Sequence, residues 1–414
     1  MKKIAMVVFS YYPSDPRVRR SAEALVEEGI MVDVICLRAN NESKEETFNG
    51  VNVYRLPIER KRGAKVQYLR EYATFIIMSS LKLAWLHAKR GYHIVHIHNM
   101  PDILVLCAII PKLTGAKVIL DLHDPMPEVY MTKYSLPYTH PVIKILLLLE
   151  KFSIRIANLV LTPNIAFKTL FTSRSCDDEK VKIIMNSPQE SIFGDSIDST
   201  LDQTKNDQFV IMYHGTIVER HGLDTALDAL TLIGDKIPNI ILNVYGDGDF
   251  RGQFIEKVKK QNLTNVVKYH GHVSLETIAD AIKHTDVGLI PNKMTTFTEI
   301  NLPTRIFEYL CMGKPVIAPK TRGITDYFDD ESIFFFNSGD ISKTGIKRES
   351  ESTSSLADTI LQVYQNPSKR QAVLKAGIVV YNKHRWKLQK SYLVEIVKEL
   401  FSKSKLRRFR SGRK

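Results

Sequence analysis

The chain has 414 residues, more than one hydrophobic core usually organises, so we expect two or three domains. Hydrophobic residues make up 44% and charged residues 25%, which argues against a disordered protein. The net charge of +13 indicates an anionic partner, which nucleic acid, an anionic membrane or an anionic substrate would each satisfy.

Cysteine usage and apolar runs bear on the compartment. The cysteines are far apart, without metal or redox spacing, and are interpreted as buried thiols in a reducing compartment: Cys36, Cys107, Cys176 and Cys311. The first apolar run is too short for a signal peptide, and no apolar stretch approaches bilayer length. We therefore expect a cytoplasmic protein.

Residues 1–190 alternate short β-rich runs with helical patterns. Strands are predicted at Ile4–Phe9, Met31–Leu37, Val51–Arg55, Ile94–His98, Val118–Asp121 and Leu159–Thr162, and helices at Arg17–Glu28, about Tyr68–Lys89 and Pro141–Ile156. Such alternation predicts a parallel sheet covered on both faces.

A polar segment at residues 191–207 interrupts the alternation and is interpreted as an interdomain linker. A second alternating series follows within residues 208–380, with a polar surface loop expected at 342–355. Its predicted strands are Val210–His214, Ile240–Tyr245, Val266–His270, Val287–Pro291, Val316–Ala318 and Ile333–Phe336. A last helix is predicted at about 381–401, followed by a basic tail at 402–414.

The segment 303–323 is the most informative part of the chain. Pro303 opens a helix, Arg305 and Glu308 lie three apart on one face, and Gly313 ends it. A helix that opens beside the carboxyl ends of parallel strands is an anion site, and a glutamate one turn in can hydrogen-bond a ribose. An ordinary capped amphipathic helix is the alternative.

This segment resembles the donor-nucleotide segment of bacterial family-four retaining glycosyltransferases, and the resemblance covers nearly the whole chain. It implies the α/β GT-B fold: two doubly wound Rossmann-like domains that face each other across a cleft. The first would serve the acceptor, the second would bind the donor nucleotide, and the last helix would cross back onto the first. The resemblance implies a nucleotide-sugar as substrate, with no cofactor and no metal.

The first motif, residues 9–20, follows the first strand. In many family members this loop is glycine-rich, whereas here it contains no glycine and resembles the Asp-Pro-Arg-Val variant. Arg17 or Arg20 would hold phosphate or acceptor; the alternative is that both are solvated bases at a helix start.

The second motif, residues 121–124, ends another strand. His123 aligns with the active-site histidine of the family, which contacts a sugar hydroxyl, and Asp121 and Asp124 would orient it. A metal site is the alternative, since Asp-x-x-Asp resembles a divalent-ion motif. The preceding His96 and His98 are a weak metal signal, and we expect them to shape the acceptor side.

The third motif, residues 213–224, departs from the family. After Gly215, Thr216 stands where the family has arginine, and His221 stands where it has lysine. Arg220 is therefore predicted as the main diphosphate ligand. If His221 contributes, binding should weaken as it deprotonates. The fourth motif, which includes Gly246 and Asp247, resembles a nucleotide-side Gly-x-Gly loop, although turn chemistry explains it almost as well.

The family motif also has two glutamates, of which Glu308 matches the second, the ribose ligand. Ile300 occupies the position of the first, so either the neighbouring Glu299 faces the donor sugar or backbone groups at Asn301 and Pro303 replace it. Arg305 would add a charge on phosphate or pair with Glu308.

Taken together, the motifs predict a retaining transferase that moves a sugar from a UDP- or GDP-linked donor to a lipid-linked or glycan acceptor. His123, Arg220 and Glu299 are the predicted catalytic residues. The basic tail and the apolar helices at 68–89 and 141–156 indicate an anionic membrane surface, unless the helices pack on the sheet and the tail is merely solvated. A sugar-nucleotide epimerase and an inactive binding-only relative stay open. No nucleic-acid partner is expected, because the sequence lacks helix-turn-helix, zinc-finger and RNP patterns.

Overall fold

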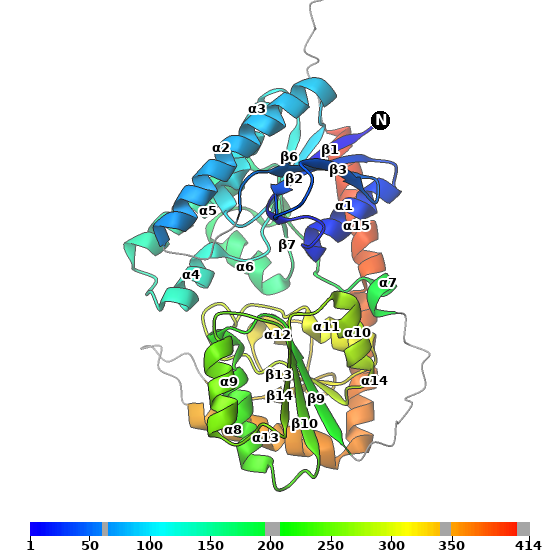
Figure 1. The fold of residues 1–414 in the computed structure, drawn as a ribbon. Coiled ribbons are helices and arrows are strands. Elements are labelled where there is room, and N and C mark those ends of the chain that lie inside the picture. Colours follow the sequence, from blue (N-terminus) through cyan, green and yellow to red (C-terminus); the bar gives the residue numbers. More distant parts are fainter. Residues whose placement is uncertain (60–64, 195–207, 340–348, 404–414) are drawn as a thin grey trace, which may run out of the picture. The chain divides into compact units, whose positions relative to one another are not determined.

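The computed structural model describes residues 1–59, 65–194, 208–339 and 349–403 (Figure 1). The chain forms two compact units: Met1–Met185 with the C-terminal part from Gln389, and Asn186–Leu388. The second unit thus begins at Asn186, before the linker expected at 191–207, and the short helix α7 (Glu190–Phe193) belongs to it and extends into that expected linker. Residues 195–207, the rest of the expected linker, lie outside the described residues.

The first unit is built on an eight-stranded sheet of order β3-β4-β2-β1-β5-β6-β7-β8. Strand β3 pairs antiparallel with β4, and the other neighbours pair in parallel. The strands are β1 (Lys3–Tyr11), β2 (Met31–Leu37), β3 (Glu45–Phe48), β4 (Val51–Leu56), β5 (Ile94–His98), β6 (Lys117–Asp121), β7 (Leu159–Thr162) and β8 (Val181–Ile183). The edge strands β3 and β8 were not predicted, because β3 is mostly polar and exposed and β8 is only three residues long.

Helices connect the parallel strands of this sheet and pack against it (Figure 1). Asp15 caps the first of them by accepting from the backbone N–H of Arg17, and Pro16 occupies its first turn. The helical segments are α1 (Pro16–Glu27), α2 (Lys65–Arg90), η1 (Asp102–Ala108), α3 (Ile109–Leu113), α4 (Met126–Tyr134), α5 (Pro141–Ile156), α6 (Ile165–Arg174) and η2 (Asp178–Lys180). Among the described helices, none combines the length and apolarity that a bilayer span requires.

The second unit is built on a six-stranded parallel sheet of order β11-β10-β9-β12-β13-β14. Its central strands are buried, and a large apolar cluster fills the space between this sheet and its helices. The strands are β9 (Phe209–His214), β10 (Ile240–Tyr245), β11 (Val267–Gly271), β12 (Val287–Leu289), β13 (Val316–Pro319) and β14 (Phe334–Phe336). All six lie where the alternating pattern predicted them, within two residues at each end.

The helices of the second unit correct two predictions. Helix α11 begins at Arg305 rather than at Pro303, and the expected surface loop at 342–355 is helical from Glu349 onward, with 340–348 outside the described residues. The segments are η4 (Glu219–His221), α8 (Leu223–Ile233), α9 (Arg251–Lys260), α10 (Leu275–Lys283), α11 (Arg305–Cys311), α12 (Arg322–Thr325), α13 (Glu349–Gln365) and α14 (Pro367–Lys383).

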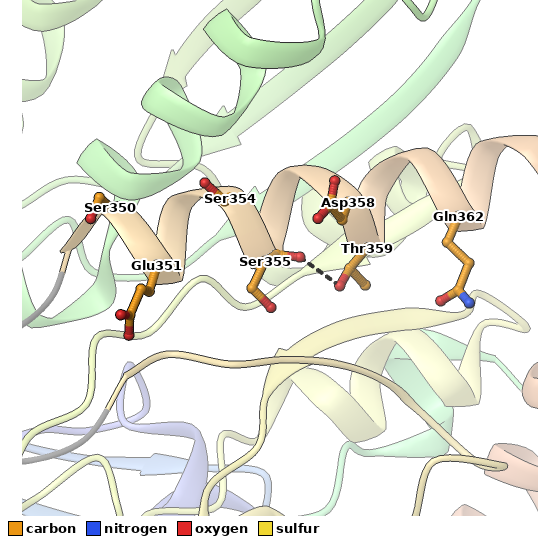
Figure 2. Close-up of a pocket in the computed structure, with 7 residues that line it drawn as sticks. All are labelled: Ser350, Glu351, Ser354, Ser355, Asp358, Thr359 and Gln362. Carbon is orange, nitrogen blue, oxygen red and sulfur yellow. Dashed lines mark hydrogen bonds between the residues drawn. The ribbon is translucent and has the colours of Figure 1, made fainter.

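A pocket lies along the first turns of α13, and all seven residues that line it come from that one helix (Figure 2). Serines and threonine dominate the lining, and Thr359 donates a hydrogen bond back to the carbonyl of Ser355. Within the part of the chain that the structure describes, the pocket is therefore a groove on one polar face of α13.

The last helix begins five residues later than the predicted start at about 381. Helix α14 ends at Lys383 and α15 (Trp386–Ser402) begins three residues later. From Gln389 onward α15 packs on the first unit: Gln389 accepts from the backbone of Met185, Lys398 pairs with Glu28, and the Phe401 ring lies 5.6 Å from that of His93. The basic tail, 404–414, lies outside the described residues.

Candidate active site

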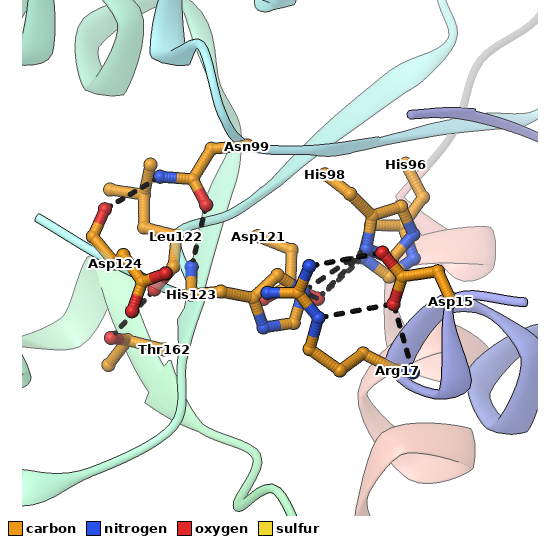
Figure 3. A network of polar contacts seen from close by, with 10 residues as sticks. All are labelled: Asp15, Arg17, His96, His98, Asn99, Asp121, Leu122, His123, Asp124 and Thr162. Carbon is orange, nitrogen blue, oxygen red and sulfur yellow. Dashed lines mark hydrogen bonds and ion pairs between the residues drawn. The ribbon is translucent and has the colours of Figure 1, made fainter. Parts of the chain in front are cut away.

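Four side chains at the carboxyl ends of β5 and β6 form what we call the histidine cluster: His96, His98, Asp121 and His123 (Figure 3). Asp121 Oδ2 lies 3.2 Å from His98 Nδ1, 3.2 Å from His123 Nε2 and 3.4 Å from His96 Nε2. All four residues are at least nine-tenths buried. The predicted pair of His123 and Asp121 is thus in contact, joined by two histidines expected only to shape the acceptor side.

The local sequence explains this convergence. His96 and His98 are two apart on one strand, so their side chains share a face of the sheet, and their rings stack with centroids 4.1 Å apart. His98 is the register partner of Asp121 on the neighbouring parallel strand. A buried parallel strand is usually a continuous apolar run, so the polar residues in Ile-Val-His-Ile-His indicate a role other than packing.

Burial sets the charge state of the cluster. It lowers the pKa of His96 to about 4 and also lowers the pKa of His98, so both are neutral at pH 7. Burial by itself would raise the pKa of Asp121, but the surrounding imidazoles hold it well below its usual range. The cluster therefore combines an ionised carboxylate with the neutral rings of His96 and His98.

Asn99 ties the two loops of this edge together, a role that we did not predict. Its side-chain oxygen accepts from the backbone N–H of His123 at 2.9 Å, and its amide donates to the carbonyl of Asp124 at 2.8 Å (Figure 3). The same amide donates to Asp102 at 2.9 Å. The position of Asn99 directly after the buried strand β5 could have indicated a role at this edge of the sheet. Asp124 thus joins the site through its backbone carbonyl.

Arg17 lies beside the histidine cluster but is held by Asp15. Its Nε and Nη2 donate to the two carboxylate oxygens at 3.1 and 3.0 Å, and its side chain is 32% exposed (Figure 3). Burial alone would raise the pKa of Asp15, but this guanidinium holds it below its usual range. Arg20, the other candidate in this loop, is buried.

In the second unit, the loops after β9 and β10 meet through their backbones. The Gly215 N–H donates to the carbonyl of Tyr245, and a Cβ on Gly246 would lie 1.9 Å from the carbonyl oxygen of Gly215. Gly246 has a φ of +131°, which L side chains rarely adopt. Gly246 is therefore needed for close backbone approach, and Asp247, which follows it, is about half exposed.

Helix α11 supplies the predicted pair of donor residues to this edge. Arg305 donates to the carbonyl of His214 at 2.8 Å, and its guanidinium lies 4.6 Å from the centre of the Tyr213 ring. Glu308 lies 3.2 Å from His214 Nε2. His214 was not predicted as a site residue. Its position as the last residue of the buried strand β9 could have indicated this role.

His221 is not a substitute for the family lysine as a cation. Its Nδ1–H donates to the carbonyl of Thr216 at 2.7 Å, and burial together with the nearby Arg305 and Arg220 lowers its pKa to about 3. The ring is therefore neutral at pH 7, and the expected weakening of binding on its deprotonation cannot arise in the neutral range. Thr216 itself is exposed.

Arg220 lies next to a buried lysine that we did not predict. The Arg220 guanidinium is 5.8 Å from the centre of the Phe297 ring, and its backbone carbonyl accepts from the N–H of Lys293. Lys293 is 7% exposed and pairs with Asp224. Its position four residues after β12, at the carboxyl edge of the sheet, could have indicated a site residue. Lys293 thus joins Arg220 and Arg305 as a third cation of this edge.

Glu299 is tied to the segment that opens α12. Its backbone carbonyl accepts from the N–H of Gly323 at 2.8 Å, and a Cβ on Gly323 would collide with the backbone of Ile300 and Asn301. Burial raises the pKa of the Glu299 carboxyl, and its Oε2 makes no hydrogen bond within the described residues. A partly buried carboxylate with one unused oxygen thus stands next to the position of the first family glutamate.

Comparisons with known families and proteins identify the relatives of this chain. Residues 14–187 match the glycosyl transferase 4-like domain, and residues 199–379 match the glycosyl transferases group 1. A chitobiosyldiphosphodolichol beta-mannosyltransferase of Candida albicans is 23% identical over 407 residues, which cover 93% of this chain and 85% of the relative.

Solved structures share the fold. Sucrose-phosphate synthase from Thermosynechococcus elongatus superposes with a TM-score of 0.75 at 16% identity, covering 98% of this chain and 100% of the other. Anabaena HepE in complex with UDP-glucose gives a TM-score of 0.69 at 15% identity, covering 96% and 100%. At such identities the likeness concerns the fold alone.

Proposed function

Since the chain belongs to the family-four glycosyltransferases of the GT-B fold, we propose that it is a retaining enzyme that takes a sugar from a UDP- or GDP-linked donor. The observation that carries the donor assignment is the edge of the second unit formed by His214, Arg305 and Glu308. A carboxylate there can accept from ribose hydroxyls, and a guanidinium beside it can bind phosphate.

The chemistry proposed for this edge is electrostatic. Arg220 and Arg305 stabilise the negative charge that grows on the departing diphosphate, and no metal takes part in this step. We assign Glu299 to the donor sugar in place of the family glutamate, because its buried Oε2 has no hydrogen bond within the described residues. His123 contacts a sugar hydroxyl, as the family resemblance implies. In a retaining GT-B reaction the leaving phosphate accepts the proton of the acceptor hydroxyl, so no separate carboxylate base is required.

The first test is a thermal-shift titration with UDP, GDP, ADP and CMP. We expect UDP or GDP to raise the midpoint of unfolding, and Glu308→Ala to abolish the rise. Glu256→Ala, which removes an exposed carboxylate on α9, is the matched control and should respond like the wild type. No shift with any nucleotide in the wild type would overturn the donor assignment.

The stereochemical part has its own test. Once a donor is identified, the anomeric proton of the newly transferred sugar is examined by NMR in the first product formed. The donor and product should have the same configuration. An inverted product would refute retention without touching the donor assignment, and free sugar without acceptor would favour the epimerase.

We further propose a lipid-linked acceptor in cell-surface polysaccharide synthesis, with the protein peripheral on the inner face of the plasma membrane. The name of the Candida albicans relative specifies a dolichol-linked acceptor, which supports this assignment. Exposed apolar side chains follow one face of α2 (Ile77, Leu81 and Trp85) and one face of α5 (Ile145, Leu148 and Phe152). Both helices pack on η1, and Lys82 and Lys89 flank the Trp85 ring.

Co-sedimentation with liposomes tests the membrane assignment. The protein should bind vesicles that contain anionic lipid and not purely zwitterionic ones, because both apolar area and positive charge contribute. The double variant Leu81→Glu with Leu148→Glu should lose most of this binding. Leu232→Glu, at a leucine on α8 that is 54% exposed against 68% for Leu81 and Leu148, is the control. Equal binding by all three proteins would refute these helix faces as the membrane surface.

A further inference from the structure

A second group of buried charges lies outside the histidine cluster and joins α4, α5 and α6 of the first unit. We call it the Arg174 network, and it comprises Arg174, Glu128, Glu150 and Asp102. Arg174 donates to the two carboxylate oxygens of Glu128 at 2.6 and 3.0 Å, and to those of Glu150 at 2.9 and 2.5 Å. One guanidinium thus holds two carboxylates, one on α4 and one on α5.

The third carboxyl of the network, that of Asp102 on η1, is buried and changes its charge near neutral pH. Asp102 is 3% exposed, and its ionisation would add a third negative charge near one guanidinium. Burial raises the pKa of Asp102 to about 7, against the hydrogen bond from Asn99. The charged groups that act on it are Glu150 on α5 and Glu128 on α4, which raise the pKa, and Arg174 on α6, which lowers it.

Asp102 contacts the residue that joins the two loops of the candidate active site. Its Oδ1 accepts from the side-chain amide of Asn99 at 2.9 Å. The same amide donates to the carbonyl of Asp124, and the side-chain oxygen of Asn99 accepts from the backbone N–H of His123 (Figure 3). The carboxyl of Asp102 is therefore connected to the backbone of His123 through a single side chain.

The charge of Asp102 decides which orientations of the Asn99 amide are allowed. An ionised carboxylate only accepts hydrogen bonds, so the NH2 group of Asn99 must face it, and the amide oxygen then faces the His123 N–H. A protonated carboxyl can also donate, so it would tolerate the reversed amide, whose NH2 group would meet the His123 N–H without an acceptor. Ionisation also strengthens the bond to Asn99, because charge-assisted hydrogen bonds are stronger than neutral ones.

A purely structural role does not account for a carboxyl at this place. An amide in place of the Asp102 carboxyl could accept the same bond from Asn99 without the cost of a buried charge. Buried ionisable groups whose pKa lies near the working pH gather at functional sites. The position of Asp102 behind the loop of His123 is such a place.

We propose that Asp102 is a positioning residue, which in its ionised form fixes the amide of Asn99 and thereby the loop that carries His123. Because Asp102 is protonated in acid, this loop should loosen as the pH falls through about 7. Turnover should fall with it. The order of the loop goes beyond the proposed function, whereas the effect on turnover rests on the proposed role of His123.

Hydrogen exchange of the full-length protein tests the order of the loop without any substrate. Exchange of the His123 backbone N–H is followed by mass spectrometry and corrected for its intrinsic rate at each pH. We expect protection to rise about tenfold from about pH 6 to about pH 8, as the ionised fraction of Asp102 does for a pKa of about 7. Protection that does not change with pH in the wild type would overturn the proposal, whether or not any variant folds.

Two variants assign this pH dependence to one carboxyl. Asp102→Asn should remove it, because the amide that replaces the carboxyl does not titrate. Asp178→Asn is the matched control, since the Asp178 side chain is 73% exposed and pairs with Lys168, and it should exchange like the wild type. The same pH dependence in Asp102→Asn as in the wild type would show that another group is responsible and would overturn the proposal.

The pH profile of turnover tests the positioning role once a donor is identified. In the wild type, kcat should fall as the pH drops through about 7. Asp102→Asn should lower kcat at about pH 8 roughly tenfold and remove this part of the profile, because its amide lets Asn99 reverse at every pH. An unchanged profile in Asp102→Asn would refute the positioning role.

The two measurements separate this proposal from the proposed function. Protection of the His123 N–H that depends on pH, in a protein that transfers no sugar, would support the order imposed by Asp102 and refute the proposed function. Sugar transfer by a wild type whose protection is independent of pH would refute the role of Asp102 alone.

Discussion

The two sheets place polar groups at the same topological position, the carboxyl ends of parallel strands, but they build it differently. In the first unit, side chains crowd around one buried carboxylate, and Asn99 bonds the loops together. In the second unit, the backbones of the loops after β9 and β10 are in contact, and glycines allow this close approach. The first edge therefore fixes the orientation of side chains, whereas the second leaves main-chain groups and cations near a ligand.

Replacing Gly246 should damage the second edge most. Gly246→Ala introduces a Cβ 1.9 Å from the carbonyl oxygen of Gly215 at a φ of +131°, so we expect a loss of about 3 kcal/mol or more in unfolding free energy. The measurement is urea denaturation followed by circular dichroism. The control is Gly252→Ala in α9, where a Cβ meets nothing within 4 Å and stability should stay or rise slightly. Similar losses in both variants would contradict the close-approach argument.

A substitution at the carboxyl edge of the first sheet should lower the turnover number, kcat, instead of the stability. Asn99→Ala removes the bonds to the backbone of His123 and Asp124, so the ring of His123 loses its fixed position. We expect kcat to fall about 100-fold, with an unchanged Kd for the nucleotide, because Asn99 lies in the other unit. Steady-state kinetics and a thermal shift with UDP separate the two effects. A matching loss of nucleotide affinity would show that the two edges are not independent.

Acid should weaken the second edge through His214. Burial and the nearby Arg305 lower its folded-state pKa to about 3, so between pH 6.5 and 3 the unfolded chain binds more protons at this site. The neutral His214 ring contributes fully to the free energy of unfolding above pH 6.5, and this contribution is lost as the pH falls. The loss between pH 7.5 and 5 is about 2 kcal/mol. The difference in unfolding free energy between wild type and His214→Asn should therefore narrow by that amount at pH 5. A constant difference would mean that His214 titrates normally.

The smallest expected effect is on nucleotide affinity, when the planar guanidinium of Arg305 is replaced by an ammonium group. Arg305→Lys keeps the charge but loses the planar contact with the Tyr213 ring and the directed bond to the carbonyl of His214. We expect UDP affinity to fall about tenfold by isothermal titration. Arg370→Lys, at an arginine of α14 whose guanidinium lies 5.7 Å from the centre of the Phe209 ring, should leave affinity unchanged. If lysine replaced Arg305 without loss, only its charge would matter.

Much of the fold was predictable because buried parallel strands produce short apolar runs at regular spacing. Strands β2, β5, β7 and β10 begin and end where the sequence predicts. The edge strands of the first sheet, β3 and β8, escaped detection, because they bury too little surface to leave an apolar signature. The break between α14 and α15 was missed as well, because residues 384 and 385 include neither proline nor glycine to mark a helix end.

The sequence predicted where most residues of the candidate site lie, but not which other residues they contact. The sequence placed His123, Asp121, Gly215, Arg305 and Glu308 near strand ends, because the chemistry of parallel sheets gathers polar residues there. It did not reveal that His221 is neutral, that Asn99 joins two loops, or that Lys293 is buried beside Arg220. Each of these depends on which groups surround the side chain in space, and burial and neighbouring charge decide a pKa or a hydrogen bond.

The sequence alone therefore determined the class of fold, the order of its elements and the edges at which chemistry can occur. The local spacing of apolar residues and glycines encodes these features. Tertiary structure decided which residues act together: three histidines from two segments meet one carboxylate only because β5 and β6 pair in register. That register depends on the packing of the whole sheet, so no local stretch of sequence could have shown it.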